Sequence, residues 1–217
     1  MTRLNILEFP VPVTIKIVAN LIDTILKTND RIPNQHISHF HSRAVPDITI
    51  EAYLTRILKF TPFSNEVLLC LLVYFDRIAK RDKHFTICSL NIHRLLITSI
   101  VIASKFTSDV YYANRRYAKV GGIALHELNK LEMEFLFLCN FKLLVRLEDL
   151  QSYGNQLLTH SLTQPTIIEQ IANMAPEPIM PIVSHQPPQT SQAGPLTPPY
   201  DPPVKKHRSV RNHPYAR

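Results

Sequence analysis

One segment of this chain is apolar on nearly every side when it is drawn as a helix. A helix at a protein surface carries its apolar residues on one stripe, whereas a helix that is apolar all round has to be buried all round. With Ser89 as its N-cap, the sequence therefore predicts a helix over about 90–106 in the middle of a helical bundle. Its apolar positions are Ile92, Leu95, Leu96, Ile97, Ile100, Val101 and Ile102.

Helical spacing of apolar residues recurs in six other segments. These cover about 12–27, 49–59, 64–80, 113–119, 124–139 and 147–158. Gly121-Gly122 suits the left-handed turn that ends a helix, and four glycines in all are too few for a many-stranded β protein. We therefore expect an all-α fold, a five-helix bundle that has the 90–106 segment at its centre, with one extra helix before the bundle and one after it.

The composition changes near residue 161. Twelve of the 17 prolines lie in residues 161–217, among Gln, Thr, Ser and His. Proline removes a backbone donor and stops helices, and the few apolar residues of this stretch cannot offset the entropy lost on ordering. We expect an N-terminal helix and lead-in loop over 1–44, a helical domain over 45–160 and a disordered Pro-rich tail over 161–217.

Composition also limits the classes of function. Hydrophobic residues make up 45% of the 217 residues, which is enough for one core. Cys70, Cys88 and Cys139 are spaced for neither disulfides nor zinc, so we interpret them as small buried thiols of a reducing compartment. With no signal peptide, and with apolar runs shorter than the roughly 20 residues that span a bilayer, no membrane contact is expected. The net charge of +7 can favour acidic partners but does not by itself indicate nucleic-acid binding.

Four charged residues stand within apolar helical segments. Arg56 and Asp76 lie in the 49–59 and 64–80 segments, and they are candidates to pair because a lone buried charge is costly. Lys105 follows the apolar run of the central helix, and Glu132 falls in the middle of the 124–139 segment. The alternative for all four is exposure to solvent, which is usual for charged residues. Spacing alone leaves both alternatives open.

Several motifs follow one another in a fixed order between residues 45 and 145, and together they point to a protein family. An Arg-bearing first helix is followed by helices containing Tyr74-Phe75-Asp76-Arg77, Ala103-Ser104-Lys105-Phe106 and Leu131-Glu132-Met133-Glu134-Phe135-Leu136. In this order they resemble the cyclin box. The spacing from Phe40 to Ile57 looks closer still to the short fungal cyclins of phosphate signalling and to plant P/U-type cyclins. The chain is therefore similar to single-box cyclins.

This resemblance implies a regulatory subunit that binds and activates a cyclin-dependent protein kinase, in phosphate, nutrient or cell-cycle signalling. It implies no catalytic residue, cofactor or metal. In cyclins, the residues matching Arg56 and Asp76 form an internal ion pair. Those matching Lys105 and Glu132 lie together on the surface that docks the mobile αC helix of the kinase. The chain has no Trp and no Met-Arg-Ala-Ile-Leu patch, so the resemblance does not extend to docking of Arg-x-Leu substrates.

Two other functions compete with kinase regulation. An enzyme would need a reactive site, but the sequence has no Gly-rich phosphate loop, nucleophile elbow or metal-ligand spacing. A cyclin-like fold can also serve as a transcription-factor-like adaptor or scaffold that contacts DNA or proteins without activating a kinase. Such factors normally carry two tandem boxes, and one is found here. Nucleic acid is therefore not the expected partner.

Several polar residues in loops and in the tail suggest further roles. His36, His39 and His41 lack the fourth ligand of structural zinc, so no metal is expected. Thr197 precedes Pro198 and suits a proline-directed kinase. A basic cluster in the tail resembles a nuclear-localisation signal, which makes the nucleus, the cytoplasm or both the expected location; its residues are Lys205, Lys206 and Arg208.

Two basic clusters lie in the helical part. We interpret them either as solvated helix ends or as a surface for an acidic or phosphorylated protein substrate or regulator. One consists of Arg115, Arg116 and Lys119, and the other of Arg77, Lys80, Arg81 and Lys83.

Overall fold

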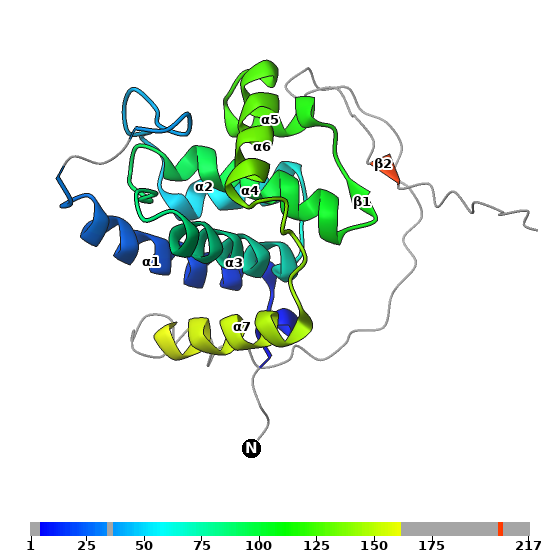
Figure 1. Cartoon of the computed structure of the whole chain (residues 1–217). Coiled ribbons are helices and arrows are strands. Elements are labelled where there is room, and N and C mark those ends of the chain that lie inside the picture. The colour runs from blue at the N-terminus through cyan, green and yellow to red at the C-terminus, as the bar shows by residue number, and fades with distance from the viewer. Residues whose placement is uncertain (1–4, 34–36, 162–203, 206–217) are drawn as a thin grey trace, which may run out of the picture.

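The computed structural model describes residues 5–33, 37–161 and 204–205. Its seven α-helices match the seven expected from the sequence, with ends that shift by at most three residues, so the all-α prediction is confirmed. A 3₁₀ turn precedes them and two short strands accompany them (Figure 1). The elements are η1 (Ile6–Glu8), α1 (Val11–Asn29), α2 (Ile50–Phe60), α3 (Asn65–Arg81), α4 (Ile92–Thr107), β1 (Val110–Tyr111), α5 (Asn114–Gly121), α6 (Leu125–Leu138), α7 (Leu147–Ser161) and β2 (Val204–Lys205).

Helix α4 is the centre of the bundle, as its apolar circumference predicts. Its buried residues occur on every side from Ile92 to Ser104, and it contacts α2, α3, α5 and α6. Helices α1 and α7 pack against α3 and against each other, which places α7 on the outside of the bundle (Figure 1). Burial ends only at Lys105 in the last turn of α4. The central helix therefore reaches the surface at the first charged residue after its apolar run.

The start of α4 differs from the sequence prediction. Asn91, and not Ser89, occupies the N-cap position. The Ser89 hydroxyl instead donates to Asp30 Oδ2 at 2.5 Å, and its backbone N–H donates to Asp30 Oδ1 at 2.9 Å. A carboxylate at the end of α1 competes for the serine, so this side chain joins two helices rather than capping one.

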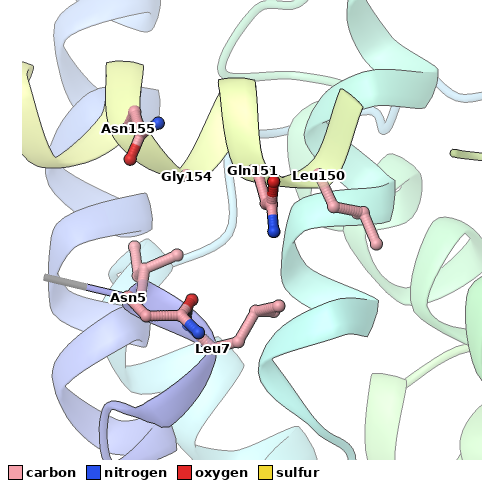
Figure 2. A pocket seen from close by; sticks show the side chains of 7 residues that line it. Asn5, Leu7, Leu150, Gln151, Gly154 and Asn155 are labelled. Atoms are coloured by element: carbon pink, nitrogen blue, oxygen red, sulfur yellow. Dashed lines mark hydrogen bonds between the residues drawn. The ribbon is translucent and has the colours of Figure 1, made fainter. Parts of the chain in front are cut away.

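The N-terminal turn is held by residues far away in the chain. The Asn65 side-chain amide donates to the carbonyl oxygens of Ile6, Leu7 and Phe9 at 3.2, 3.2 and 2.6 Å. Gly154 of α7 lies against Ile6, and a Cβ at this glycine would approach Ile6 Cγ2 to 2.6 Å. A pocket of about 220 Å³ remains between η1 and α7, with amide side chains at its rim (Figure 2). Asn65 and Gly154 therefore allow η1 to close the base of the bundle.

The connection between α6 and α7 is shaped by an unusual backbone turn. The two residues after the C-cap of α6, Asn140 and Phe141, both have a positive φ, 51° and 57°. The Phe141 N–H donates to Leu136 O and the Asn140 N–H to Phe137 O, each at 2.9 Å, which is the Schellman pattern that satisfies the last carbonyls of a helix. Left-handed backbone is rare for a bulky aromatic residue. The turn therefore projects Phe141 in a direction that ordinary helical backbone would not give.

The strands were not predicted. Strand β1 follows α4 and pairs antiparallel with β2, which belongs to the Pro-rich tail. The expectation of a disordered tail otherwise concerns residues outside the described ones, except for Ser161, which ends α7. Within the described part of the chain, no helix combines the length and the apolar character needed to cross a bilayer.

Candidate functional site

The structure brings Lys105 and Glu132 together. Lys105 Nζ lies 2.6 Å from Glu132 Oε1, where the end of α4 meets the middle of α6. Glu132 stands beside the core residues Leu131 and Phe135 on α6, so its side chain is only 16% exposed, and that of Lys105 is 31% exposed. A pair this far out of water is held more firmly than a surface ion pair, because solvent screens it less.

Asn114 completes this cluster and was missed by the sequence analysis. Its Nδ2 donates to Glu132 Oε2 at 2.7 Å and to Asn129 Oδ1 at 2.8 Å. Both carboxylate oxygens of Glu132 therefore have a partner, one from α4 and one from the first residue of α5. A single asparagine at a helix start carries no sequence signal that would have shown this.

Exposed apolar side chains stand close to the pair along the chain. Phe106 follows Lys105 on α4, Met133 follows Glu132 on α6, and Phe137 lies one turn further along α6. Phe137 is 59% exposed and packs edge-to-face against Phe141, which is 56% exposed, with ring centroids 5.3 Å apart. We call this set the Lys105–Glu132 surface; its residues are Lys105, Phe106, Glu132, Met133, Phe137 and Phe141. Exposed apolar groups around a half-buried charge pair are typical of a protein-binding surface.

Helix α3 fixes the backbone that carries the two phenylalanines. Arg81 Nη1 donates to the carbonyl oxygens of Phe137 and Leu138 at 3.0 and 3.1 Å. Arg77 Nη1 donates to those of Lys142 and Leu144 at 3.2 and 2.9 Å. These arginines come from one of the two basic clusters noted in the sequence. They are therefore used within the fold and do not simply face solvent.

The predicted ion pair between Arg56 and Asp76 does not form. Asp76 Oδ2 instead accepts from Lys80 Nζ at 2.7 Å and from the Tyr153 hydroxyl of α7. Burial alone would raise the pKa of Asp76, but these hydrogen bonds outweigh it and the pKa lies below its usual value. Arg56 is exposed.

Arg56 and Asp76 do not meet because their side chains face different parts of the fold. Arg56 lies off the buried stripe of α2, one turn from Tyr53, whose hydroxyl donates to Gly121 O of α5 at 3.2 Å. The hydrogen bond to Tyr153 shows that Asp76 faces α7. Tyr153, whose pKa is raised by burial and by the hydrogen bond to Asp76, is thus a second residue that the sequence analysis missed.

The other basic cluster is divided between structure and surface. Arg116 Nε donates to Phe60 O at 2.7 Å, and its guanidinium lies 4.5 Å from the Tyr112 ring centroid. Arg115 and Lys119 are exposed on α5. Among the described residues, neither forms an ion pair with an acid.

The histidines and cysteines form no metal-binding group in the described part of the chain. There, no three His, Cys, Asp or Glu side chains are arranged to hold a metal, and His36 lies outside the described residues. His39 pairs with Glu134 at 3.5 Å, whereas His41 contacts Ser38 and Cys88. The prediction of small buried thiols is confirmed. Burial raises the pKa of Cys70 to about 11 and that of Cys139 to about 12, and it raises the pKa of Cys88 above its usual value.

The tail predictions fall largely outside the described residues. Thr197, Lys206 and Arg208 are not described, whereas Lys205 lies in β2.

Comparison with known proteins identifies the fold family. The family model described as Cyclin matches residues 21–143. PHO85 cyclin-7 of Saccharomyces cerevisiae is 44% identical over 179 residues, which cover 71% of this chain and 63% of that protein. The PHO85 cyclin-like protein psl1 of Schizosaccharomyces pombe is 56% identical over 122 residues, or 55% of this chain and 50% of psl1. Cyclin-U4-1 of Arabidopsis thaliana is 40% identical over 157 residues, or 70% of this chain and 78% of that protein.

The match thus spans less than two thirds of the two fungal proteins and more than two thirds of the plant one. Both groups are those that the motif spacing resembled. A family model that covers more than half of the sequence, together with a bundle built around α4, leads to one conclusion: the chain belongs to the cyclin family.

Proposed function

We propose that this protein is a non-catalytic regulatory subunit that binds and activates a cyclin-dependent protein kinase, in phosphate, nutrient or cell-cycle signalling. The names of the PHO85 cyclin relatives suggest a kinase of the PHO85 type as the partner. The observation that carries the proposal is the 2.6 Å contact between Lys105 and Glu132, with exposed apolar side chains close to both residues along the chain. A kinase would dock on this Lys105–Glu132 surface through its αC helix.

The mechanism follows from what an active kinase requires. A protein kinase is active only when a lysine of its β3 strand pairs with a glutamate of its αC helix. A cyclin that binds the inward position of αC more tightly than the outward one shifts the population toward the active kinase. Lys105 and Glu132 offer one cation and one carboxylate for polar groups of αC. Phe106, Met133 and Phe137 offer the apolar area that excludes water around them.

The magnitude shows why the whole surface is needed. Moving a kinase from 1:99 to 99:1 in favour of the active state takes about 5.5 kcal/mol of differential binding energy. Removing one partner of a buried charge pair at an interface typically changes the binding energy by about 2–5 kcal/mol. The pair alone falls short of this requirement, so the phenylalanines beside it have to contribute.

A charge-swap experiment separates docking from simple stability. Lys105→Glu and Glu132→Lys each place like charges side by side, and each should weaken binding of the PHO85-type kinase at least about 30-fold, the lower end of that range. The double swap, Lys105→Glu/Glu132→Lys, restores an ion pair inside the protein but presents both charges reversed to the kinase. We expect it to recover the melting temperature and not to recover kinase binding or activation.

The chain offers a matched control in Lys80 and Asp76, whose ion pair is 2.7 Å long and lies on α3. Reversing these two charges should leave kinase affinity unchanged. Recovery of kinase binding by the double swap at Lys105 and Glu132 would contradict direct docking, because it would mean that the pair matters only for folding. Both readouts, calorimetric binding and kinase activity on a peptide substrate, use the full chain.

We also propose that an acidic or phosphorylated substrate or regulator binds the exposed basic residues of α5. Arg115 and Lys119 are four residues apart, and like charges at this spacing destabilise a helix. Arg115 also stands in the first turn, where a cation is unfavourable to the helix dipole. Reversing both charges should raise KM for an acidic substrate protein while kcat and kinase affinity stay unchanged. Equal KM values would contradict this assignment.

A further inference from the structure

The tail returns to the helical domain at strand β1. Val110 pairs with Lys205 and Tyr111 with Val204 in an antiparallel arrangement (Figure 1). The 42 residues 162–203 separate this tail strand from the end of α7. A contact between segments so distant in sequence is not imposed by chain connectivity, so β1 itself has to offer something that binds extended backbone.

Strand β1 is held in an extended form by the residues beside it. The Ser108 hydroxyl donates to Val110 O at 2.7 Å, and the Val110 N–H donates to the Ser108 hydroxyl at 3.2 Å. On the other side, Tyr112 packs against the Tyr117 ring, with centroids 6.2 Å apart, and against Arg116. An ordered strand at the edge of a sheet is a site for the addition of another strand.

The position of β1 links it to the Lys105–Glu132 surface. Lys105, five residues before Val110, binds one oxygen of Glu132, and Asn114, three residues after Tyr111, binds the other. Strand β1 is therefore the middle of the short connection that holds both partners of Glu132. A strand paired with β1 is therefore attached to the segment that positions both partners of Glu132.

We propose that the edge of β1 is a strand-addition site whose occupant is the chain's own segment Val204–Lys205, and that this tethered strand competes with the kinase for the Lys105–Glu132 surface. The competition rests on the proposed function; the strand addition does not. The geometry favours the tail as occupant because the tail strand is already paired with β1 and is tethered to the same chain. Tethering makes the encounter intramolecular.

The size of the effect follows from the short pairing. Two residue pairs form a weak strand that a kinase can displace. When binding requires displacement, the apparent affinity falls by the fraction of time that the site is free. A strand formed nine-tenths of the time therefore weakens kinase binding about tenfold. The tail would act as a modest brake, and a change that loosens it would raise activation.

Backbone substitutions in the tail test the strand directly. The double variant Val204→Pro/Lys205→Pro removes both N–H donors of the tail strand and changes no residue of the helical domain. Val204→Ala/Lys205→Ala is the matched control, since it removes the same side chains and keeps the donors. Hydrogen exchange of the peptide over residues 107–113 should become several-fold faster in the Pro variant and stay unchanged in the Ala variant. Equal exchange in all three proteins would refute the strand addition.

Protection that grows with protein concentration would also refute the intramolecular strand, because it would show that β1 pairs with the tail of a second copy.

Kinase affinity of the same three full-length proteins tests the competition. We expect the Pro variant to bind the PHO85-type kinase about 3- to 10-fold more tightly than the parent, in the range set by the free fraction of the site, and the Ala variant to match the parent. Faster exchange with unchanged or weaker affinity would refute the competition and keep the strand. Failure of all three proteins to bind the kinase would refute the proposed function and the competition together, while the exchange data would still decide the strand.

Discussion

The contact between Gly154 and Ile6 gives a prediction whose sign depends on the neighbouring residue. Gly154 lies inside α7, where replacing glycine by alanine normally stabilises a helix by about 1 kcal/mol. In this protein the new Cβ would lie 2.6 Å from Ile6 Cγ2, a distance that real Cβ atoms essentially never show. Because Ile6 is itself buried, it has to leave its site or push η1 away from α7.

The lost burial of Ile6 and the gain in helix propensity at Gly154 can be compared as free energies. Loss of a fully buried isoleucine destabilises by about 1.5–3 kcal/mol from lost burial, against a gain of about 1 kcal/mol from helix propensity. We therefore expect Gly154→Ala alone to lower the free energy of unfolding by about 0.5–2 kcal/mol, the difference between these terms. Without the Ile6 side chain the clash disappears, so in an Ile6→Ala background the same substitution should stabilise by about 1 kcal/mol.

Urea unfolding of the parent, both single variants and the double variant measures this cycle directly. The expected coupling between the two sites is about 1.5–3 kcal/mol, which is typical of residues in contact. Stabilisation of the parent by Gly154→Ala, or equal effects in both backgrounds, would show that Ile6 does not lie against Gly154 of α7.

Three further predictions concern the core. Asn65→Asp keeps the side-chain shape but removes the donor for three carbonyl oxygens of the η1 segment; it should lower the unfolding free energy by about 1–3 kcal/mol and speed proteolysis of the N-terminus. His93, whose pKa burial lowers from 6.5, stays neutral in the folded protein while the unfolded chain takes up a proton. Stability should therefore fall as the pH drops below about 6.5, and His93→Gln should flatten this slope in melts between pH 7 and 5. Phe135→Leu removes ring contacts to three aromatic neighbours and should lower the free energy of unfolding by about 2–4 kcal/mol. Phe137→Leu, on the exposed side of the same helix, should change the free energy of unfolding by less than about 0.5 kcal/mol and should weaken kinase binding.

Much of the fold could be read from the sequence because helix formation and burial leave a local record. Apolar spacing along a segment predicts both that it is helical and which side of it is buried. The segment with no polar side, Ile92–Thr107, is also the helix that the others surround. Lys105 marks the end of that burial, and the family resemblance pointed to Glu132 as its neighbour.

The contacts across helices were decided by the tertiary structure. The sequence suggested Arg56 as the partner of Asp76, but packing turns Asp76 toward Tyr153. Asn114 binds Glu132, and the tail strand binds β1, without any local pattern that announces either contact. The physical reason is that spacing along one helix determines which of its faces is apolar. Which faces of different helices meet depends on how all side chains fill the space between them, and that information is distributed over the whole chain.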